Sequence, residues 1–323
     1  MATSMRTAEK TRLPGLYVAG ATAIISGISV FVNSYGVKSF TSPAVYTTAK
    51  NLAATLVIAA FVVVAWLASR RATPLEGAAA GQHPAAAAPR QLQGLARWTG
   101  FAYVATIGGG AAFILFFDGL ARTSAVPAVF LHDTLVIWVA LAALPLLGER
   151  LGRWNLVAIA LLVVGVTATS GGVGHLELNS GNALVLGATV LWAIETVIAK
   201  RLLTGVAPST LALVRMGGGA VVLVGYLAAT GQFPTLVGLG ASELRWALIT
   251  GCLLGGYVAT WMAALARARA VDVTSVLVSS AVVTLFLDAV VHHTGLASDT
   301  IGLVLLALGV VAVVRAWPRV AHA

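Results

Sequence analysis

The sequence predicts an all-α integral membrane protein with ten transmembrane helices, arranged as two inverted repeats of five helices. Of its 323 residues, 59% are hydrophobic and only 10% are charged, and the mean hydropathy is +0.94. A soluble domain usually carries about 25% charged residues, so much of this surface requires lipid as its solvent. Long continuous apolar runs favour helices, because the strands of a membrane barrel alternate apolar and polar residues. The two halves of the chain also resemble each other.

Ten apolar runs are each expected to cross a hydrocarbon core of about 30 Å. The predicted spans are 15–35, 44–69, 98–119, 125–147, 154–171, 181–200, 209–230, 245–266, 271–291 and 300–318. The first run is too long for the apolar region of a signal peptide, so it is expected to be the first span. The ninth contains several Ser and Thr residues and Asp288.

The distribution of positive charge predicts the orientation. With a cytoplasmic amino terminus, fifteen Lys and Arg residues fall in inner segments and only Lys38, Arg122 and Arg245 in outer ones. Positively charged loops remain on the cytoplasmic side. We therefore expect a multi-pass protein of the cell membrane with both termini in the cytoplasm, and these charges explain the net charge of +9 without nucleic acid binding.

The domain organisation follows from the spans. A cytoplasmic tail over 1–14 precedes a first five-helix repeat over 15–171, and a second repeat covers 181–318. The segment 70–97 is rich in Ala, Pro and Gly, which is typical of a flexible cytoplasmic linker.

Three pairs of segments indicate the duplication. "SPAVYTTAK" (42–50) aligns with "APSTLALVR" (207–215) without a gap, which places Lys50 over Arg215. "LARTSAV" (120–126) aligns with "LARARAV" (265–271), and "LLVVGV" (161–166) with "LLALGV" (305–310). Because each repeat has five spans, the two copies cross the membrane in opposite directions. Such inverted repeats bind substrate between the copies.

These features resemble the drug/metabolite transporter (DMT) superfamily, in its ten-helix EamA-type branch. The segments that carry the resemblance are "LPLLGERLGRWNLVAIALLVVGV" in the first repeat, and "LVLGATVLWAIETVIAKRLL" and "PSTLALVR" in the second. The resemblance covers roughly residues 15–316. It implies a secondary transporter that moves small organic metabolites, amino-acid-like or amphipathic solutes, by alternating access. Efflux from the cell is the expected direction.

Ionisable residues inside the spans are candidate transport residues, because burying a charge in the membrane is costly. Asp133 would bind a substrate amine or carry a proton, or else form a structural ion pair with Lys50. His132 would couple transport to protons, or else hydrogen-bond a neighbouring helix as a neutral side chain. Glu195 would line an inner vestibule or pair with a nearby base.

Lys50 and Arg215 occupy equivalent repeat positions. Both would meet a substrate carboxylate, or both would tie helices to backbone carbonyls or to acids such as Asp133 and Glu195. Trp192, Trp138 and Tyr257 would wall the substrate cavity, unless they are packing or interfacial anchors. Trp192 is the first choice because it lies three residues from Glu195, on nearly the same helix face.

No motif for nucleotide hydrolysis, metal binding or nucleophilic catalysis is found, so we expect neither an enzyme nor a cofactor. The single cysteine, Cys252, rules out an intrachain disulfide. Expected partners are a small-molecule substrate, membrane lipids and protons as a coupling ion, with the protein a monomer or homodimer. The alternatives are a translocator of lipids or lipid-linked substrates, a membrane enzyme that acts on such substrates, and a non-transporting membrane partner protein.

Overall fold

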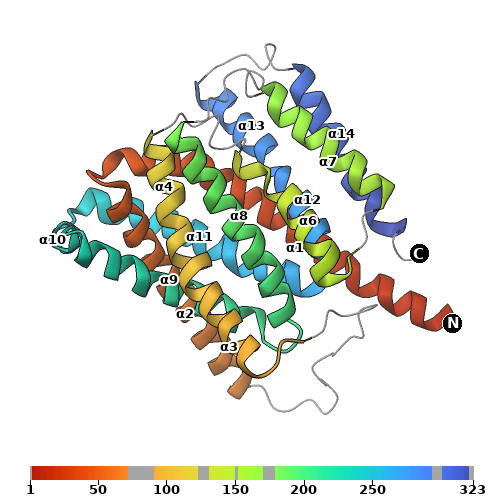
Figure 1. Cartoon of the computed structure of the whole chain (residues 1–323), viewed down its shortest axis with the longest axis horizontal. Coiled ribbons are helices and arrows are strands. Elements are labelled where there is room, and N and C mark those ends of the chain that lie inside the picture. Colours follow the sequence, from red (N-terminus) through yellow and green to blue (C-terminus); the bar gives the residue numbers. More distant parts are fainter. Residues whose placement is uncertain are drawn as a thin grey trace.

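The computed structural model describes residues 2–71, 91–122, 131–149, 152–169, 179–292 and 300–319 (Figure 1). These residues form helices and short connections, and no β-strand occurs among them. The prediction of an all-α protein is confirmed for this part of the chain. Most of the predicted linker, residues 72–90, lies outside the described ranges.

The helices of the first half are α1 (Ala2–Gly36), α2 (Pro43–Arg71), α3 (Gly94–Tyr103), α4 (Ala112–Arg122), α6 (Leu135–Leu147) and α7 (Arg153–Thr169). A short 3₁₀ turn, η1 (Val37–Ser39), follows α1, and a π-helical segment, η2 (Val104–Ala111), joins α3 to α4. The helix α1 therefore extends back through most of the predicted tail.

The helices of the second half are α8 (Ser180–Leu202), α9 (Pro208–Ala229), α10 (Phe233–Val237), α11 (Ala241–Arg267), α12 (Ala270–Val278), α13 (Ser280–His292) and α14 (Thr300–Arg319). The predicted ninth span is thus two helices. The break lies at Ser279, whose backbone N–H donates to Val276 O at 3.0 Å and whose hydroxyl donates to the same carbonyl. This i to i−3 pattern tightens the last turn of α12 and ends it.

Seven helices in the described ranges are long and apolar enough to cross a membrane. They are Tyr17–Ser39, Pro43–Leu67, Gly94–Arg122, Ser180–Leu202, Pro208–Ala229, Ala241–Arg267 and Ala270–Val291. Two shorter apolar helices, Leu131–Leu147 and Arg153–Gly165, and the helix α14 lie at the other three predicted spans. The chain is therefore a multi-span membrane protein, and the number of ten spans stays a prediction.

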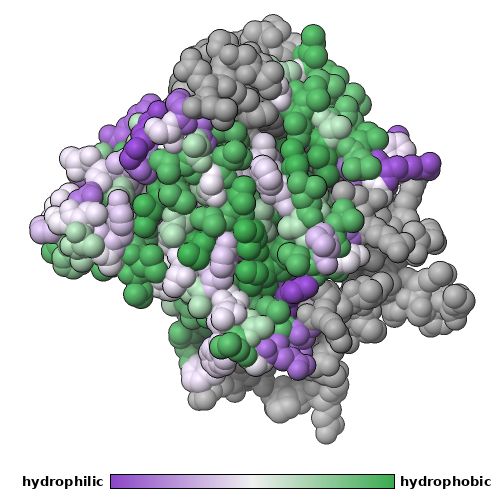
Figure 2. Space-filling model, viewed as in Figure 1, coloured by the Kyte–Doolittle hydropathy of each residue, from purple (hydrophilic) through white to green (hydrophobic). Residues whose placement is uncertain are grey.

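The outer surface is strongly apolar, as lipid contact requires. Figure 2 shows hydrophobic side chains over much of the visible face, with hydrophilic ones gathered toward its edges. Large apolar side chains that are more than half exposed include Leu56, Phe61, Leu141, Val221 and Ile301. In water, an apolar area this extensive would drive association.

Helices from the two halves interlock in the interior. The helices α1 and α2 pack against α11, α4 packs against α8, and η2 packs against α9. At one side, α7 lies alongside α14 (Figure 1). The interface between the halves therefore passes through the middle of the molecule, and the functional residues described next lie along it.

Candidate functional site

A cavity of about 400 Å³ lies between the two halves. Its walls come from α1, α2, α4, α6 and the preceding turn in the first half, and from α8, α9, α11 and α13 in the second. Seven of the eight predicted site residues line it: Lys50, His132, Asp133, Trp192, Glu195, Arg215 and Tyr257. The eighth, Trp138, does not; its indole N–H donates to Thr134 Oγ1 at 3.1 Å, one turn back in the same segment.

Arg215 and Glu195 form a buried ion pair on the cavity wall. The Arg215 guanidinium donates through Nε to Glu195 Oε1 at 2.5 Å and through Nη2 to Oε2 at 3.1 Å. The two side chains are only 7% and 5% exposed. The sequence left open whether Glu195 lines an inner vestibule or pairs with a nearby base. In the structure Glu195 pairs with Arg215 on the wall of the cavity.

The π-helical segment η2 supports this pair. The Gly108 carbonyl accepts hydrogen bonds from Arg215 Nη2 at 3.3 Å and from Trp192 Nε1 at 3.0 Å. A Cβ atom on Gly108 would overlap the Glu195 carboxyl group, and one on Gly109 would overlap the Arg215 carbonyl oxygen. Glycine at these two positions lets α8 and α9 approach η2 closely enough to make the contacts, and π-helical turns are often found at functional sites.

Lys50 is held differently from Arg215. Its ammonium is 4.1 Å from the Phe117 ring centroid and 5.1 Å from that of Tyr46, and Nζ donates to Asn33 Oδ1 at 3.3 Å. The residue is 3% exposed. Among the described residues no acid forms an ion pair with it, so the structural pair with Asp133 considered from the sequence is absent.

Asp133 and His132 lie next to each other at the cavity, where α6 begins. Asp133 Oδ1 is 3.7 Å from His132 Nδ1, and the buried Oδ2 atom has no hydrogen-bond partner among the described residues. The His132 ring also contacts the rings of Trp192 and Phe116, each at a centroid distance of 5.6 Å. Asp133 therefore lines the cavity with one carboxylate oxygen that no described residue satisfies.

The rest of the cavity wall is largely aromatic. Phe113 and Phe116 contact Trp192 at centroid distances of 5.2 and 5.4 Å, and Tyr257 stacks on Trp261 at 6.1 Å. The sequence analysis did not select Asn33, Tyr46 or the phenylalanines of α4. The signal for the phenylalanines is the segment "FILFF" (113–117), which places three rings on a helix turn that also faces Lys50.

The cavity reaches the end of α1 where η1 begins, since Ser34, Val37 and Lys38 line it. Nearer the middle of α1, Gly15 lies against Arg267 and Ala268 at the end of α11. Gly15 and Gly36 are separated by roughly 30 Å along the helix at 1.5 Å per residue.

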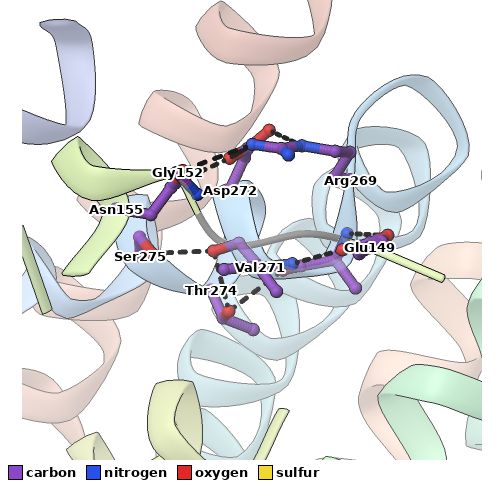
Figure 3. A network of polar contacts seen from close by, with 9 residues as sticks. Glu149, Gly152, Asn155, Arg269, Val271, Asp272, Thr274 and Ser275 are labelled. Atoms are coloured by element: carbon purple, nitrogen blue, oxygen red, sulfur yellow. Dashed lines mark hydrogen bonds and ion pairs between the residues drawn. The ribbon is translucent and has the colours of Figure 1, made fainter. Parts of the chain in front are cut away.

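A polar network lies near this point, beside the start of α12 (Figure 3). Glu149, which follows α6, accepts the backbone N–H groups of Ala270 and Val271 at 2.9 and 3.1 Å and so caps α12. Asp272 accepts two hydrogen bonds from Arg269, at 2.6 and 2.7 Å.

Asn155 at the start of α7 donates to Asp272 at 3.0 Å. We call Glu149, Asn155, Arg269 and Asp272 the inter-half clamp, because two of its residues come from each half. Burial raises the pKa of the Glu149 carboxyl above its ordinary value, and its two backbone donors offset part of this rise. Within the described ranges, no group of three His, Cys, Asp or Glu residues is placed to hold a metal ion.

Comparison with known proteins identifies the family. The model of the EamA-like transporter family matches the chain twice, over residues 13–171 and 179–315. Twenty-eight solved chains are similar in structure. One of them, described as the crystal structure of a protein, has a TM-score of 0.69 and 16% sequence identity over 93% of this chain and 96% of that one. This likeness supports the fold alone.

No curated protein matches the chain by sequence. The family model, in contrast, covers nearly its whole length, in two copies whose limits are close to those of the two sequence repeats. The chain therefore belongs to the EamA-like transporter family.

Proposed function

We propose that this protein is a secondary transporter that exports small amphipathic, amino-acid-like metabolites from the cytoplasm by alternating access. The observation that carries the proposal is the cavity between the halves, which combines buried charges with an aromatic wall. Small-molecule sites are mostly apolar clefts with a few polar groups that fix the orientation of the ligand. A volume of about 400 Å³ suits a solute of amino-acid size.

The sequence repeats support alternating access. Two five-span copies in opposite orientations place their interface near the middle of the membrane, and rocking of one copy against the other exposes the site to each side in turn. The cavity lies along that interface, and the inter-half clamp joins the two halves at one end of the molecule. By the charge distribution this end faces the cytoplasm, so alternating access requires the contacts of the clamp to break when the site opens to the cytoplasm.

Asp133 is the proposed coupling or amine-binding residue. Asp133 lines the same cavity as the aromatic wall, and its buried Oδ2 atom has no partner among the residues described. A carboxylate in this position binds a substrate amine or a proton. His132, in contact with Asp133 and Trp192, would adjust the charge of the acid.

Counterflow in liposomes tests the proposal. Purified protein is reconstituted, and exchange of labelled amino acids and related metabolites is measured against empty liposomes. We expect saturable exchange of at least one solute, and its loss in Asp133→Asn. The matched control is Asp118→Asn, because Asp118 forms an exposed pair with Arg122 away from the cavity. Absence of exchange across the panel, with movement of a labelled lipid instead, would contradict the proposal.

A further inference from the structure

The duplication gives the cavity two equivalent cations, but only one of them is neutralised. Lys50 and Arg215 correspond in the alignment of the two repeats. Arg215 donates hydrogen bonds to both carboxylate oxygens of Glu195, so its positive charge is neutralised by an acid of the protein itself. Lys50 is equally buried, yet within the described part of the chain it has no acidic partner.

The sequence explains the difference. When the alignment that pairs Lys50 with Arg215 is extended toward the amino terminus without a gap, Val30 pairs with Glu195. The first repeat therefore has an apolar side chain where the second has the acid that neutralises its cation. Val30 lies on the cavity wall, one helical turn from Asn33, whose side chain contacts Lys50.

The surroundings of Lys50 leave most of its N–H donors without a protein acceptor among the described residues. An ammonium has three N–H donors, and Asn33 Oδ1 is the one protein acceptor found for them among the described residues. The rings of Tyr46, Phe113 and Phe117 stabilise a cation through their faces but accept no conventional hydrogen bond. An anion in the cavity that Lys50 lines would compensate the charge of this buried ammonium and accept its remaining donors.

We propose that Lys50 is the anion-binding residue of the cavity, and that it selects solutes carrying a carboxylate attached to an apolar body. Arg215 does not serve this role, because Glu195 occupies it. The apolar body packs on the aromatic wall formed by Phe116, Phe117 and Trp192. This inference rests on the proposed function for the identity of the site, but it concerns binding and is tested without transport.

The first experiment measures binding to the purified protein by thermal shift. The probes are three pairs of equal shape that differ in charge: 3-phenylpropionate and its amide, hexanoate and its amide, and N-acetylphenylalanine and its amide. We expect at least one carboxylate to bind at least about tenfold more tightly than its amide, because a hydrogen bond to a charged group is the stronger one. If no carboxylate binds more tightly than its amide, the proposal is wrong.

Variants assign the preference to Lys50. Lys50→Met is expected to abolish it, and Lys50→Arg to retain it. Arg97→Met is the matched control, because Arg97 also lies over an aromatic ring, that of Phe101 at 5.8 Å, but is outside the cavity. A carboxylate preference that persists in Lys50→Met would overturn the inference.

Restoring the missing acid is a test that leaves Lys50 in place. Val30→Glu puts a carboxylate where the second repeat has Glu195, so the acid would compete with the ligand for Lys50. We expect carboxylate binding at least about tenfold weaker in Val30→Glu, and retained in the uncharged control Val30→Gln. Equal binding by both variants would contradict the proposal.

The two proposals fail in different ways. Lys50-dependent carboxylate binding without exchange of any solute in liposomes would leave the inference standing and remove the transport function. Exchange that treats carboxylates and amides alike, and that is unchanged in Lys50→Met, would leave transport standing and remove the inference.

Discussion

Replacing Arg215 by Met isolates the contribution of the buried ion pair. The guanidinium makes two bonds to Glu195, at 2.5 and 3.1 Å, and one to Gly108 O at 3.3 Å. Methionine fills a similar volume but leaves a buried carboxylate without a partner. Removing one member of a buried pair costs about 3–5 kcal/mol, because the desolvation of the remaining charge is no longer compensated. At about 2 °C per kcal/mol, the midpoint of thermal unfolding should fall by roughly 6–10 °C.

The assay is thermal unfolding in detergent, followed by circular dichroism, for Arg215→Met, Glu195→Met and the double variant. The double variant should lie much closer to the wild type than the sum of the single changes, because apolar pairs often replace buried ion pairs without loss of stability. The control is the exposed pair of Arg122 and Asp118, where screening by solvent limits the effect to about 0–1 kcal/mol. Additive effects of the two single changes at Arg215 and Glu195 would refute the reasoning.

Three further predictions concern the support of the site. Gly108→Ala should lower the unfolding midpoint by several degrees, since its Cβ would overlap the Glu195 carboxyl group, whereas Gly187→Ala in open space should leave the midpoint nearly unchanged or slightly raised. Asp272→Ala should increase the rate of thiol labelling of a cysteine placed at buried Ser275 by about tenfold, because the hydrogen bonds that Asp272 accepts from Arg269 and Asn155 are lost. The labelling is measured in a background without the native cysteine. An unchanged rate would mean that the clamp does not hold this end closed. A carboxyl whose pKa is raised in the folded state contributes stability below its ordinary pKa and loses this contribution as the pH rises through the raised value. The free energy of unfolding of the wild type should therefore fall relative to that of Glu149→Gln as the pH increases from about 4. A difference between the two proteins that does not vary with pH would contradict this.

The sequence predicted the cavity residues well because charge in a membrane span is costly. Lys50, Asp133, Glu195 and Arg215 stand out in apolar runs, and all four line one cavity. The sequence offered Asp133 and Glu195 as possible partners of Lys50 and Arg215, but it could not say which pairs form. Arg215 and Glu195 lie on different helices, α9 and α8, and helix packing rather than sequence spacing decides that they meet.

Other features depend on tertiary contacts that leave weak marks in a sequence. The glycines at 108–110 indicate close packing, but not that Gly108 offers its carbonyl to two side chains. The break at Ser279 lies within the predicted span 271–291, whose Ser and Thr residues did not show that it would form two helices. Trp138 is an aromatic residue of a predicted span, as the cavity residue Trp192 is, but its indole N–H donates within its own segment. Sequence alone does not tell which of two such residues faces the cavity.

The cap on α12 has a consequence for biogenesis. Its acceptor, Glu149, belongs to the first half of the chain, whereas the N–H groups that it accepts belong to the second. During synthesis the carboxylate is in place well before the helix that it caps emerges, so the later half completes its fold on the earlier one. If the two halves were expressed as separate chains, the second would lack the acceptor for the Ala270 and Val271 N–H groups until it met the first.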